Sequence, residues 1–393
     1  MVNSLLTATA ITREALRILH QKATFLSTIN KGYDDRFAKK GAKIGDTLQI
    51  RLPNRYLVRD GITYSGQSTT ERKVDLTVSK VKGVDLDFTT TDLTLDMDDF
   101  SKRVIEPAVS VLASSIEADV LQNLRKKVFN QYDNQGSAGT YAKTLLARKL
   151  LQDSLAPNDD RACLLNTLDM PELVGSTSTL FNDPKSISMQ YREGVMGYAA
   201  GLTFAESTHL APQSRGTANG GYLTNGATQT GAVIGIDTGT GTITAGEVVT
   251  FAGVYKVHPE TKVSLGILQQ FVVTADFAGG TGNLNVSPAV VATGAYQNVS
   301  QSVPDGAAVV VSGTAGTAYG QSLIYQKEAF TFATADLVID DSMTFAAREN
   351  FDGISMRLVK QYDITDDVVK TRLDVLYGYL ATMPEFAARI ANH

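Results

Sequence analysis

Apolar and polar residues alternate in two stretches near the beginning of the chain. In residues 47–52 the apolar side chains share one face. Within residues 74–88 they occupy the even positions of two runs, 74–78 and 84–88, whereas Asp, Thr and Ser fill many of the odd ones. A period of two is typical of a half-buried strand. The pattern therefore predicts an extended hairpin over residues 44–90, joined by the mainly polar residues 53–73.

This hairpin is predicted to lack a core of its own. A two-stranded hairpin is only marginally stable in water, so it needs a surface to lie on. We expect a neighbouring copy of the chain to provide that surface and to bury the even-numbered face. The charged residues around the tip then become candidate intersubunit contacts, namely Arg51, Arg55, Arg59 and Asp60. The pattern indicates assembly and not catalysis.

After the hairpin the period changes to that of a helix. Apolar residues recur at every fourth position from Val104 to Val128, and basic residues gather near the end, as the helix dipole favours. This predicts one long helix within residues 97–131. Pro107 lies either in its first turn or at a kink.

The rest of the chain mixes helix and strand patterns. A helix that exposes Glu14 is predicted within residues 1–32, and residues 141–221 alternate helical and strand-like runs. Residues 226–320 have few charges and many Thr, Val, Gly and Ala in short alternating runs, which predicts a small all-β domain, a barrel or a sandwich. Because strands resume over residues 325–393, we interpret this domain as an insertion.

Composition and charge narrow the function. The 393 residues are 43% hydrophobic and 20% charged, which is typical of a soluble globular protein with two or three domains. The formal net charge of −5 argues against a protein whose main role is to grip nucleic acid. The single cysteine, Cys163, fits a reducing compartment. The first residues predict neither a signal peptide nor a membrane anchor, so we expect no membrane partner.

Motifs for enzyme chemistry are missing from the sequence. It contains no P-loop, no His-Glu-x-x-His, no Cys-x-x-Cys and no Gly-x-Ser-x-Gly, and its four histidines are scattered. The acidic run from Asp85 to Asp99 does not fit a calcium loop, and a wet strand face followed by a helix cap explains it better. We therefore expect no catalytic residues, no cofactor and no metal. The basic residues of the hairpin favour intersubunit ion pairs over nucleic-acid contacts, because acidic neighbours dilute them.

Two segments resemble the coat proteins of tailed phages related to phage P-twenty-two. Residues 246–277 are similar to the inserted domain of those proteins, with a Phe-Ala-Gly-Val start, a His-Pro-Glu-Thr-Lys turn and a Leu-Gln-Gln-Phe-Val-Val strand in the expected order. Residues 353–389 are similar to their closing strands. The order of hairpin, long helix, interrupted α/β domain and return strands is similar to the Hong Kong 97-type capsid fold. The resemblance covers nearly the whole chain and implies an α+β protein of that fold.

The resemblance also implies how the chain is divided. The implied parts are an N-terminal arm (1–43), an extended hairpin loop (44–90), a peripheral domain with the spine helix (91–140), the first part of the axial domain (141–221), an inserted small β-barrel (222–324) and axial and peripheral return strands (325–393). A loop of the inserted domain contacts a neighbour across a twofold axis in such proteins, which adds four candidate contacts: Lys256, His258, Glu260 and Lys262. Glu14, in the N-terminal arm, is a candidate contact for a scaffolding protein.

The function implied by the resemblance is that of a major capsid protein. Its copies would assemble through pentamers and hexamers into an icosahedral shell, the capsid of a virion, in the cytoplasm of the host bacterium. The implied partners are a scaffolding protein, a portal protein, non-specifically enclosed double-stranded DNA and optional decoration proteins. The alternative is a cellular encapsulin-like shell protein that holds cargo enzymes, although the inserted β-domain favours the viral protein. A tail or fibre protein fits less well, because it would not need the long helix and the interrupted α/β domain.

Overall fold

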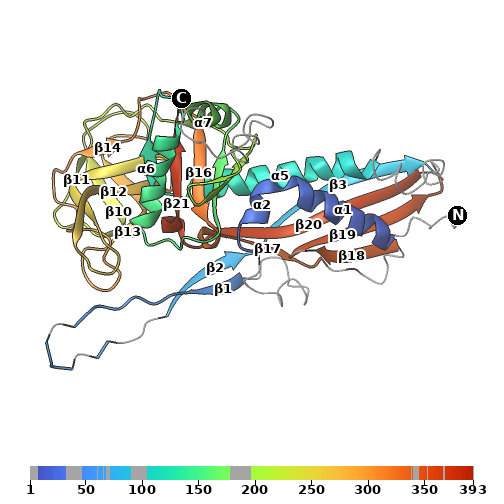
Figure 1. Ribbon diagram of the computed structural model, residues 1–393, viewed down its shortest axis with the longest axis horizontal. Helices are drawn as coiled ribbons and strands as arrows, with labels where there is room; N and C mark the ends of the chain where they lie inside the picture. Colours follow the sequence, from blue (N-terminus) through green and yellow to red (C-terminus); the bar gives the residue numbers. More distant parts are fainter. Residues whose placement is uncertain are drawn as a thin grey trace. The chain divides into compact units, whose positions relative to one another are not determined.

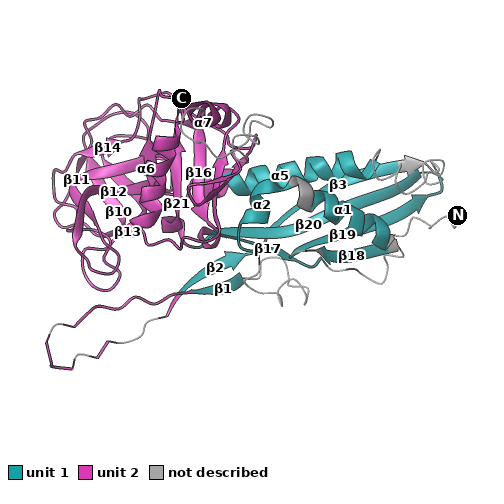
Figure 2. Cartoon of the chain, viewed as in Figure 1, with its two compact units in different colours: residues 1–51, 73–121, 330–382 teal, residues 52–72, 122–329, 383–393 magenta. Residues whose placement is uncertain are grey.

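The chain is a mixed α+β protein that divides into two compact units (Figure 1, Figure 2). The computed structural model describes residues 8–31, 47–59, 61–64, 66–67, 71–89, 104–177, 196–337, 339, 345–351, 353–365 and 368–392. Unit 1 consists of Met1–Arg51, Lys73–Leu121 and Phe330–Thr382. Unit 2 consists of Leu52–Arg72, Gln122–Ala329 and Met383–His393.

Unit 1 is built on a five-stranded antiparallel sheet around one long central strand. The strands of this sheet are β3 (Lys80–Thr89), β17 (Phe330–Ala335), β18 (Phe345–Phe351), β19 (Ile354–Asp363) and β20 (Val368–Ala381). β20 pairs with β3, β17 and β19, and β19 pairs with β18. The helices of this part are α1 (Ala8–Lys22), α2 (Thr24–Thr28) and α5 (Glu106–Arg125) up to Leu121. α1 packs against β18 and β19, as Figure 1 shows.

The hairpin is shorter than the sequence pattern predicted. β1 (Thr47–Leu52) and β2 (Arg72–Thr77) form a two-stranded sheet of their own. Residues 80–89, which continue the same alternation, form β3 and pair with β20 instead. Alternation shows that a segment is a strand, but it does not show which strand supplies the hydrogen-bonding partner. The predicted hairpin over residues 44–90 is therefore corrected to the β1–β2 ladder and the loop between these strands.

The apolar face of this short hairpin is buried within its own chain. Ile50 and Leu76 are at most 1% exposed, and they pack in one cluster with Ala335 and Leu376 of unit 1. The prediction that the hairpin lacks a core of its own is therefore wrong for the strands. A neighbouring copy is not needed to cover their even-numbered positions.

The long helix begins where its proline allows. α5 begins at Glu106, directly after the π-helical residues Val104 and Ile105. Pro107 is the second residue of α5, a position near the helix start where proline is tolerated. Its stripe includes Val109, Ile116 and Val120, each at most 1% exposed. The prediction of a long helix is confirmed within the described residues.

The α/β part of unit 2 is a six-stranded mixed sheet with helices packed against it. Its strand order is β4 (Gln131–Asp133), β21 (Ala387–Ala391), β16 (Gln321–Gln326), β5 (Arg161–Leu165), β7 (Leu202–Glu206) and β6 (Tyr198–Ala199). The helices are α6 (Tyr141–Gln152) and α7 (Asp169–Thr177), and the 3-10 turns are η3 (Lys327–Ala329) and η4 (Pro384–Phe386). The sequence pattern indicated α6, β5 and α7 but missed β21, because the fully buried Arg389 interrupts an otherwise apolar run.

Unit 2 also contains a six-stranded antiparallel sheet with its own core. Its strand order is β14 (Val309–Val311), β11 (Val248–Val257), β12 (Ser264–Val273), β13 (Gly282–Val290), β10 (Gly231–Asp237) and β9 (Leu223–Thr224). The two ends of this order are joined, because the Val309 N–H donates to the Tyr222 carbonyl and the Thr224 N–H donates to the Ala307 carbonyl. Inside the sheet, the rings of Phe251 and Phe271 lie 5.4 Å apart.

The chain enters and leaves this sheet at one place. β8 (Gln213–Ser214) precedes the sheet and β15 (Ala318–Tyr319) follows it, and the two strands pair antiparallel. The residues between them pack around a core that runs from Ala218 to Val311. One adjacent pair of connections therefore carries a complete β-structure.

Candidate functional site

The loop between β1 and β2, residues 52–72, carries large apolar side chains that its own chain leaves uncovered. Figure 1 shows it as a long connection beyond the ends of the two strands, and we call it the arm. Tyr56 is 55% exposed, Val58 and Tyr64 are each 89% exposed, and Ile62 is 99% exposed. The sequence pattern indicated a mainly polar connection here, and these apolar side chains were not predicted as contacts. The sequence does contain a sign of them. Apolar residues lie close to Gly61 in a stretch without the period of a strand or a helix, so no regular element is predicted that would bury them.

The two legs of the arm are tied to each other. The Gln67 side chain donates from Nε2 to the Leu57 carbonyl at 2.6 Å and accepts the Leu57 N–H at 2.8 Å. These two bonds imitate a ladder pair beyond the end of the β1–β2 sheet. Within the sheet, Lys73 Nζ donates to Gln49 Oε1 at 3.2 Å.

The base of the arm contacts two further residues of unit 2. Arg55 Nη2 lies 3.2 Å from Glu385 Oε1 and forms an ion pair with it. The Arg72 guanidinium carbon lies 5.7 Å from the centre of the Tyr296 ring, within the range of a cation–π interaction. One contact comes from each leg. The sequence predicted Arg55 as a contact residue, but it did not show that Arg55 pairs with Glu385 or that Arg72 lies over the Tyr296 ring.

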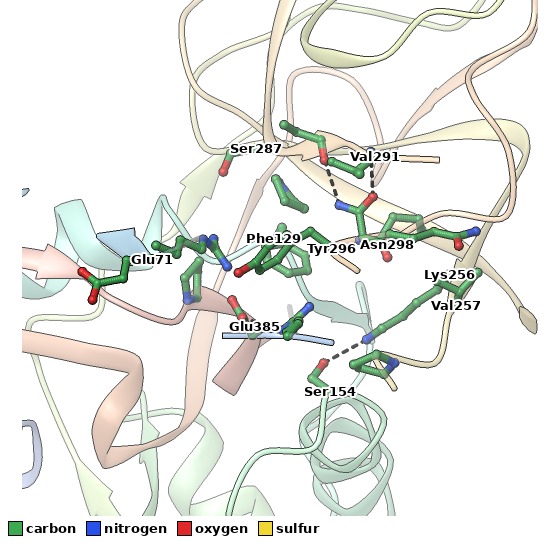
Figure 3. A pocket seen from close by; sticks show the side chains of 18 residues that line it. Glu71, Phe129, Ser154, Lys256, Val257, Ser287, Val291, Tyr296, Asn298 and Glu385 are labelled. Carbon is green, nitrogen blue, oxygen red and sulfur yellow. Dashed lines mark hydrogen bonds and ion pairs between the residues drawn. The ribbon is translucent and has the colours of Figure 1, made fainter. Parts of the chain in front are cut away.

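A cavity of about 490 Å³ lies at the base of the arm, within unit 2 (Figure 3). It is lined by aromatic and aliphatic side chains and by five charged residues: Arg55, Glu71, Arg72, Lys256 and Glu385. Figure 3 shows Lys256 reaching Ser154, to whose Oγ it donates at 2.9 Å. Burial lowers the pKa of Lys256 to about 8.

The four candidate contacts of the inserted domain, Lys256, His258, Glu260 and Lys262, differ in how far their side chains are exposed. Lys256 is 8% exposed and bonded inside its own unit. His258 Nδ1 accepts the backbone N–H groups of Glu260 and Thr261, at 3.3 and 3.2 Å. Glu260 is exposed.

Lys262 is used within its own loop region. Its Nζ donates to the carbonyls of Pro259 and Ala295 at 2.7 Å and to that of Gln297 at 3.3 Å. The contact of this loop with a neighbouring subunit stays a prediction. Glu260 is the member of the set whose side chain reaches the surface.

The remaining candidate residues are spread over two parts of the chain. Arg51 is exposed on β1 and Arg59 is exposed in the arm, whereas Asp60 lies outside the described residues. Glu14 is half-buried on α1 and accepts a hydrogen bond from Arg17 Nε at 2.9 Å. Its contact with a scaffolding protein stays a prediction.

Among the residues that the structure describes, no three or more His, Cys, Asp or Glu side chains gather where they could hold a metal ion. None of the helices among these residues has both the length and the apolar character that a membrane span needs. Cys163 is completely buried, and this burial, with the nearby charge of Asp169, raises the pKa of its thiol. A thiol in this state is a poor nucleophile.

Comparisons with known proteins give a family. The family described as "P22 coat protein - gene protein 5" matches residues 174–389, which is more than half of the chain. No curated protein sequence matches the chain.

Solved structures with a similar arrangement share few identical residues with the chain. A structure from Mycobacterium phage Che8 is 12% identical, with 94% of this chain and 90% of that chain covered and a TM-score of 0.48. The mature capsid of bacteriophage PhiM1 is 10% identical, with coverages of 88% and 82% and a TM-score of 0.43. A virus-like particle from Pyrococcus furiosus is 7% identical, with coverages of 97% and 98% and a TM-score of 0.40.

Proposed function

The chain belongs to the P22 coat protein family, and from this membership we propose how its parts build a shell. It is a major capsid protein, a structural protein of a bacteriophage virion whose copies associate to form the capsid. The observation that carries this conclusion is the family match over residues 174–389, which includes the β9–β14 sheet and most of the closing strands.

The subunit takes the Hong Kong 97-type fold. Residues 1–43 form the N-terminal arm, and α5 is the spine helix of a peripheral domain. The six-stranded mixed sheet of unit 2 belongs to the axial domain. Residues 222–324 form an inserted β-barrel. The joined ends of its strand order and the adjacent β8 and β15 connections support this part of the proposal.

The shell is icosahedral and contains pentamers and hexamers. A closed shell of one sequence needs heterologous contacts around each ring and self-complementary contacts across twofold axes. The tip of the arm provides a ring contact by docking on the adjacent subunit, and Arg51, Arg59 and Asp60 remain candidate contact residues of the hairpin. The exposure of the apolar side chains at the tip supports this role. Glu260 is the proposed contact across a twofold axis.

Further partners follow from the same proposal. A scaffolding protein guides assembly in the host cytoplasm and contacts the N-terminal arm at Glu14, and a portal occupies one vertex. The shell encloses double-stranded DNA non-specifically, and the formal net charge of −5 argues against a strong grip on it. Decoration proteins bind the outer surface where they are present. The protein has no catalytic activity of its own.

Electron microscopy of the purified protein tests the proposal. We expect closed icosahedral shells when the chain is produced in bacteria together with the scaffolding protein of its phage, and DNA-filled shells from infected cells. Rods, or subunits that never assemble, would contradict it. The encapsulin-like alternative predicts shells that contain cargo protein and no genome, which mass spectrometry and nucleic-acid quantification of the same particles distinguish.

A further inference from the structure

We infer that Glu385 and Tyr296 are positioning residues for the arm, because they fix the direction of residues 52–72 relative to the rest of unit 2 before any neighbour is met. The inference rests on the proposed docking of the arm and names the residues that prepare it. A subunit whose arm already points in the docking direction loses less conformational entropy when it joins a ring.

Each leg of the arm has its own anchor. Arg55 lies three residues beyond the end of β1, and Arg72 is the first residue of β2. The side chains of Arg55 and Glu385 are 29% and 19% exposed, so solvent screens this ion pair less than it screens a fully exposed one. The Arg72–Tyr296 contact holds the second leg. Two anchors on two legs restrict rotation of the arm as well as its tilt.

The cavity makes these two contacts decisive. About 490 Å³ of space lies at the base of the arm, and Glu385 and Tyr296 both line it (Figure 3). Close-packed apolar side chains would hold the base of the arm through many small contacts. The cavity leaves room for fewer such contacts, so the ion pair and the cation–π contact contribute more to the direction of the arm.

The residue that receives the first leg is itself held in place. Glu385 lies in η4, and Asn130 Nδ2 donates to the backbone carbonyls of Glu385 and Ala387, each at 3.1 Å. Ala387 is the first residue of β21. The carboxylate of Glu385 is therefore mounted just before the beginning of β21, an inner strand of the six-stranded sheet.

The residue that receives the second leg is held as firmly. Lys262 Nζ donates to the carbonyls of Ala295 and Gln297, which flank Tyr296. Asn298 closes the same loop, because its Oδ1 accepts the Val291 N–H at 2.9 Å and its Nδ2 donates to a neighbouring carbonyl. Lys262, a candidate intersubunit residue in the sequence analysis, therefore holds the backbone on both sides of Tyr296, whose aromatic ring contacts Arg72.

The direction set at the base reaches the tip. The two Gln67–Leu57 hydrogen bonds tie the legs together between the anchors and the apolar residues. The legs therefore move as one piece, and a change of angle at Arg55 or Arg72 displaces the tip.

Distance measurements between two spin labels on the unassembled full-length subunit test this inference. The labels are placed at Thr63→Cys, in the arm, and at Ala227→Cys, in an exposed turn of unit 2; the buried Cys163 does not react. We expect one narrow distance distribution in the parent and a distribution at least about twofold broader in Glu385→Gln and in Tyr296→Leu. Tyr296→Phe, which keeps the aromatic face, and the charge exchange Arg55→Glu with Glu385→Arg are expected to restore the narrow distribution.

An unchanged distribution in Glu385→Gln and Tyr296→Leu would overturn the inference. A thermal melt of each variant shows that the broadening does not come from unfolding. The docking role is judged separately by the shell yield of an arm-tip variant, so failure of docking and failure of positioning give different results.

Discussion

The carboxylate of Glu117 accepts the backbone N–H of Phe25 at 2.8 Å, although 92 residues separate the two in the sequence. Phe25 is in the first turn of α2, whose N-cap residue, Ala23, makes no side-chain cap hydrogen bond. The long helix α5 therefore supplies the cap that α2 lacks. Burial raises the pKa of Glu117 to about 7, against the opposing effect of backbone N–H groups of Phe25 and Thr24.

This cap predicts a pH dependence of stability. The pKa of Glu117 in the folded protein, about 7, lies above the ordinary value of 4.5, so the folded state binds more protons between these values. The stability contributed by the protonated carboxyl is fully present below pH 4.5 and is lost as the pH rises through 7. Glutamine keeps an acceptor and does not titrate.

We therefore expect Glu117→Gln to become more favourable relative to the parent as the pH rises. The change between about pH 4 and about pH 8 should be on the order of 1–3 kcal/mol in unfolding free energy. Chemical denaturation of the unassembled subunit at both pH values measures it. Glu117→Leu, which removes the acceptor as well, should be less stable than the glutamine variant at both. A constant difference between Glu117→Gln and the parent would show that this carboxyl does not titrate in the window.

A second prediction concerns Gly83 in β3, the strand that the sequence pattern placed in the hairpin. Gly83 lies opposite Asp374 in the β3–β20 ladder, and a Cβ there would meet the Asp374 carboxylate and, at 2.6 Å, the Leu373 carbonyl oxygen. Asp374 cannot easily move, because Arg357 Nη2 and Arg372 Nε hold it at 2.7 and 2.8 Å.

We expect Gly83→Ala to lower the unfolding free energy by about 1–3 kcal/mol, as overpacking in a well-packed core does. Denaturant unfolding of the unassembled subunit measures the loss. Gly175→Ala is the matched control, since it adds the same methyl group to α7 with nothing within 4 Å, and a helix favours alanine. Equal stability of Gly83→Ala and the parent would mean that β3 does not lie this close to β20.

Sequence periodicity predicted the kind of element well and its partner poorly. The i+4 stripe of α5 and the buried run of β5 each follow from burial of one surface, which leaves a regular mark on the sequence. Residues 80–89 carry the same alternation as a hairpin strand, yet their backbone groups pair with β20. Partner choice depends on contacts that are distant in sequence, and alternation contains no information about them.

The candidate site shows the same division. Charge in the predicted hairpin suggested Arg55 as an intersubunit contact, and the resemblance to the coat proteins suggested Lys256. In the structure Arg55 pairs with Glu385 and Lys256 is buried against Ser154. Long cationic side chains can reach back into their own unit, and sequence alone does not show in which direction they point. The apolar side chains at the tip of the arm were not predicted as contacts, because periodicity does not show that a residue such as Ile62 is exposed. Only the structure shows this exposure.

Lys256 allows a direct test of the two interpretations of that residue. The pKa of Lys256 in the folded protein, about 8, lies below the ordinary value of 10.5. Burial of the charged lysine therefore lowers the stability of the folded protein below pH 8. This cost disappears as the pH rises toward 10.5. Ser154 Oγ keeps its bond to the Leu150 carbonyl without the lysine. We expect Lys256→Met to be at least as stable as the parent at neutral pH, with an advantage that shrinks above pH 8.

Shell yield then separates an internal from an intersubunit role. We expect Lys256→Met to assemble as the parent does, as judged by sedimentation and electron microscopy. Glu260→Gln, in the exposed turn that follows β11, is the comparison that removes a surface charge. A stable Lys256→Met subunit that no longer forms shells would restore the intersubunit contact predicted from the sequence.

The apolar tip of the arm makes the prediction on which the proposed docking depends most. Burial of one isoleucine side chain contributes about 1.5–3 kcal/mol, and each ring of subunits repeats the contact. An aspartate in its place would have to be desolvated at the interface, which is unfavourable. Ile62 is 99% exposed in the subunit, so Ile62→Asp should leave the thermal stability of the unassembled protein unchanged while it strongly reduces shell yield. Thr63→Asp is the matched control.

Thr63 is the next residue of the same exposed loop, so the control adds the same charge without removing apolar surface. We expect shell yield to fall much more in Ile62→Asp than in Thr63→Asp, and sedimentation of assembly reactions at several protein concentrations measures both. Equal losses would assign the effect to charge at the tip, and normal yield in both would mean that the tip does not dock on a neighbour. A higher protein concentration should partly rescue Ile62→Asp, because a weakened contact shifts the assembly equilibrium and does not abolish the fold.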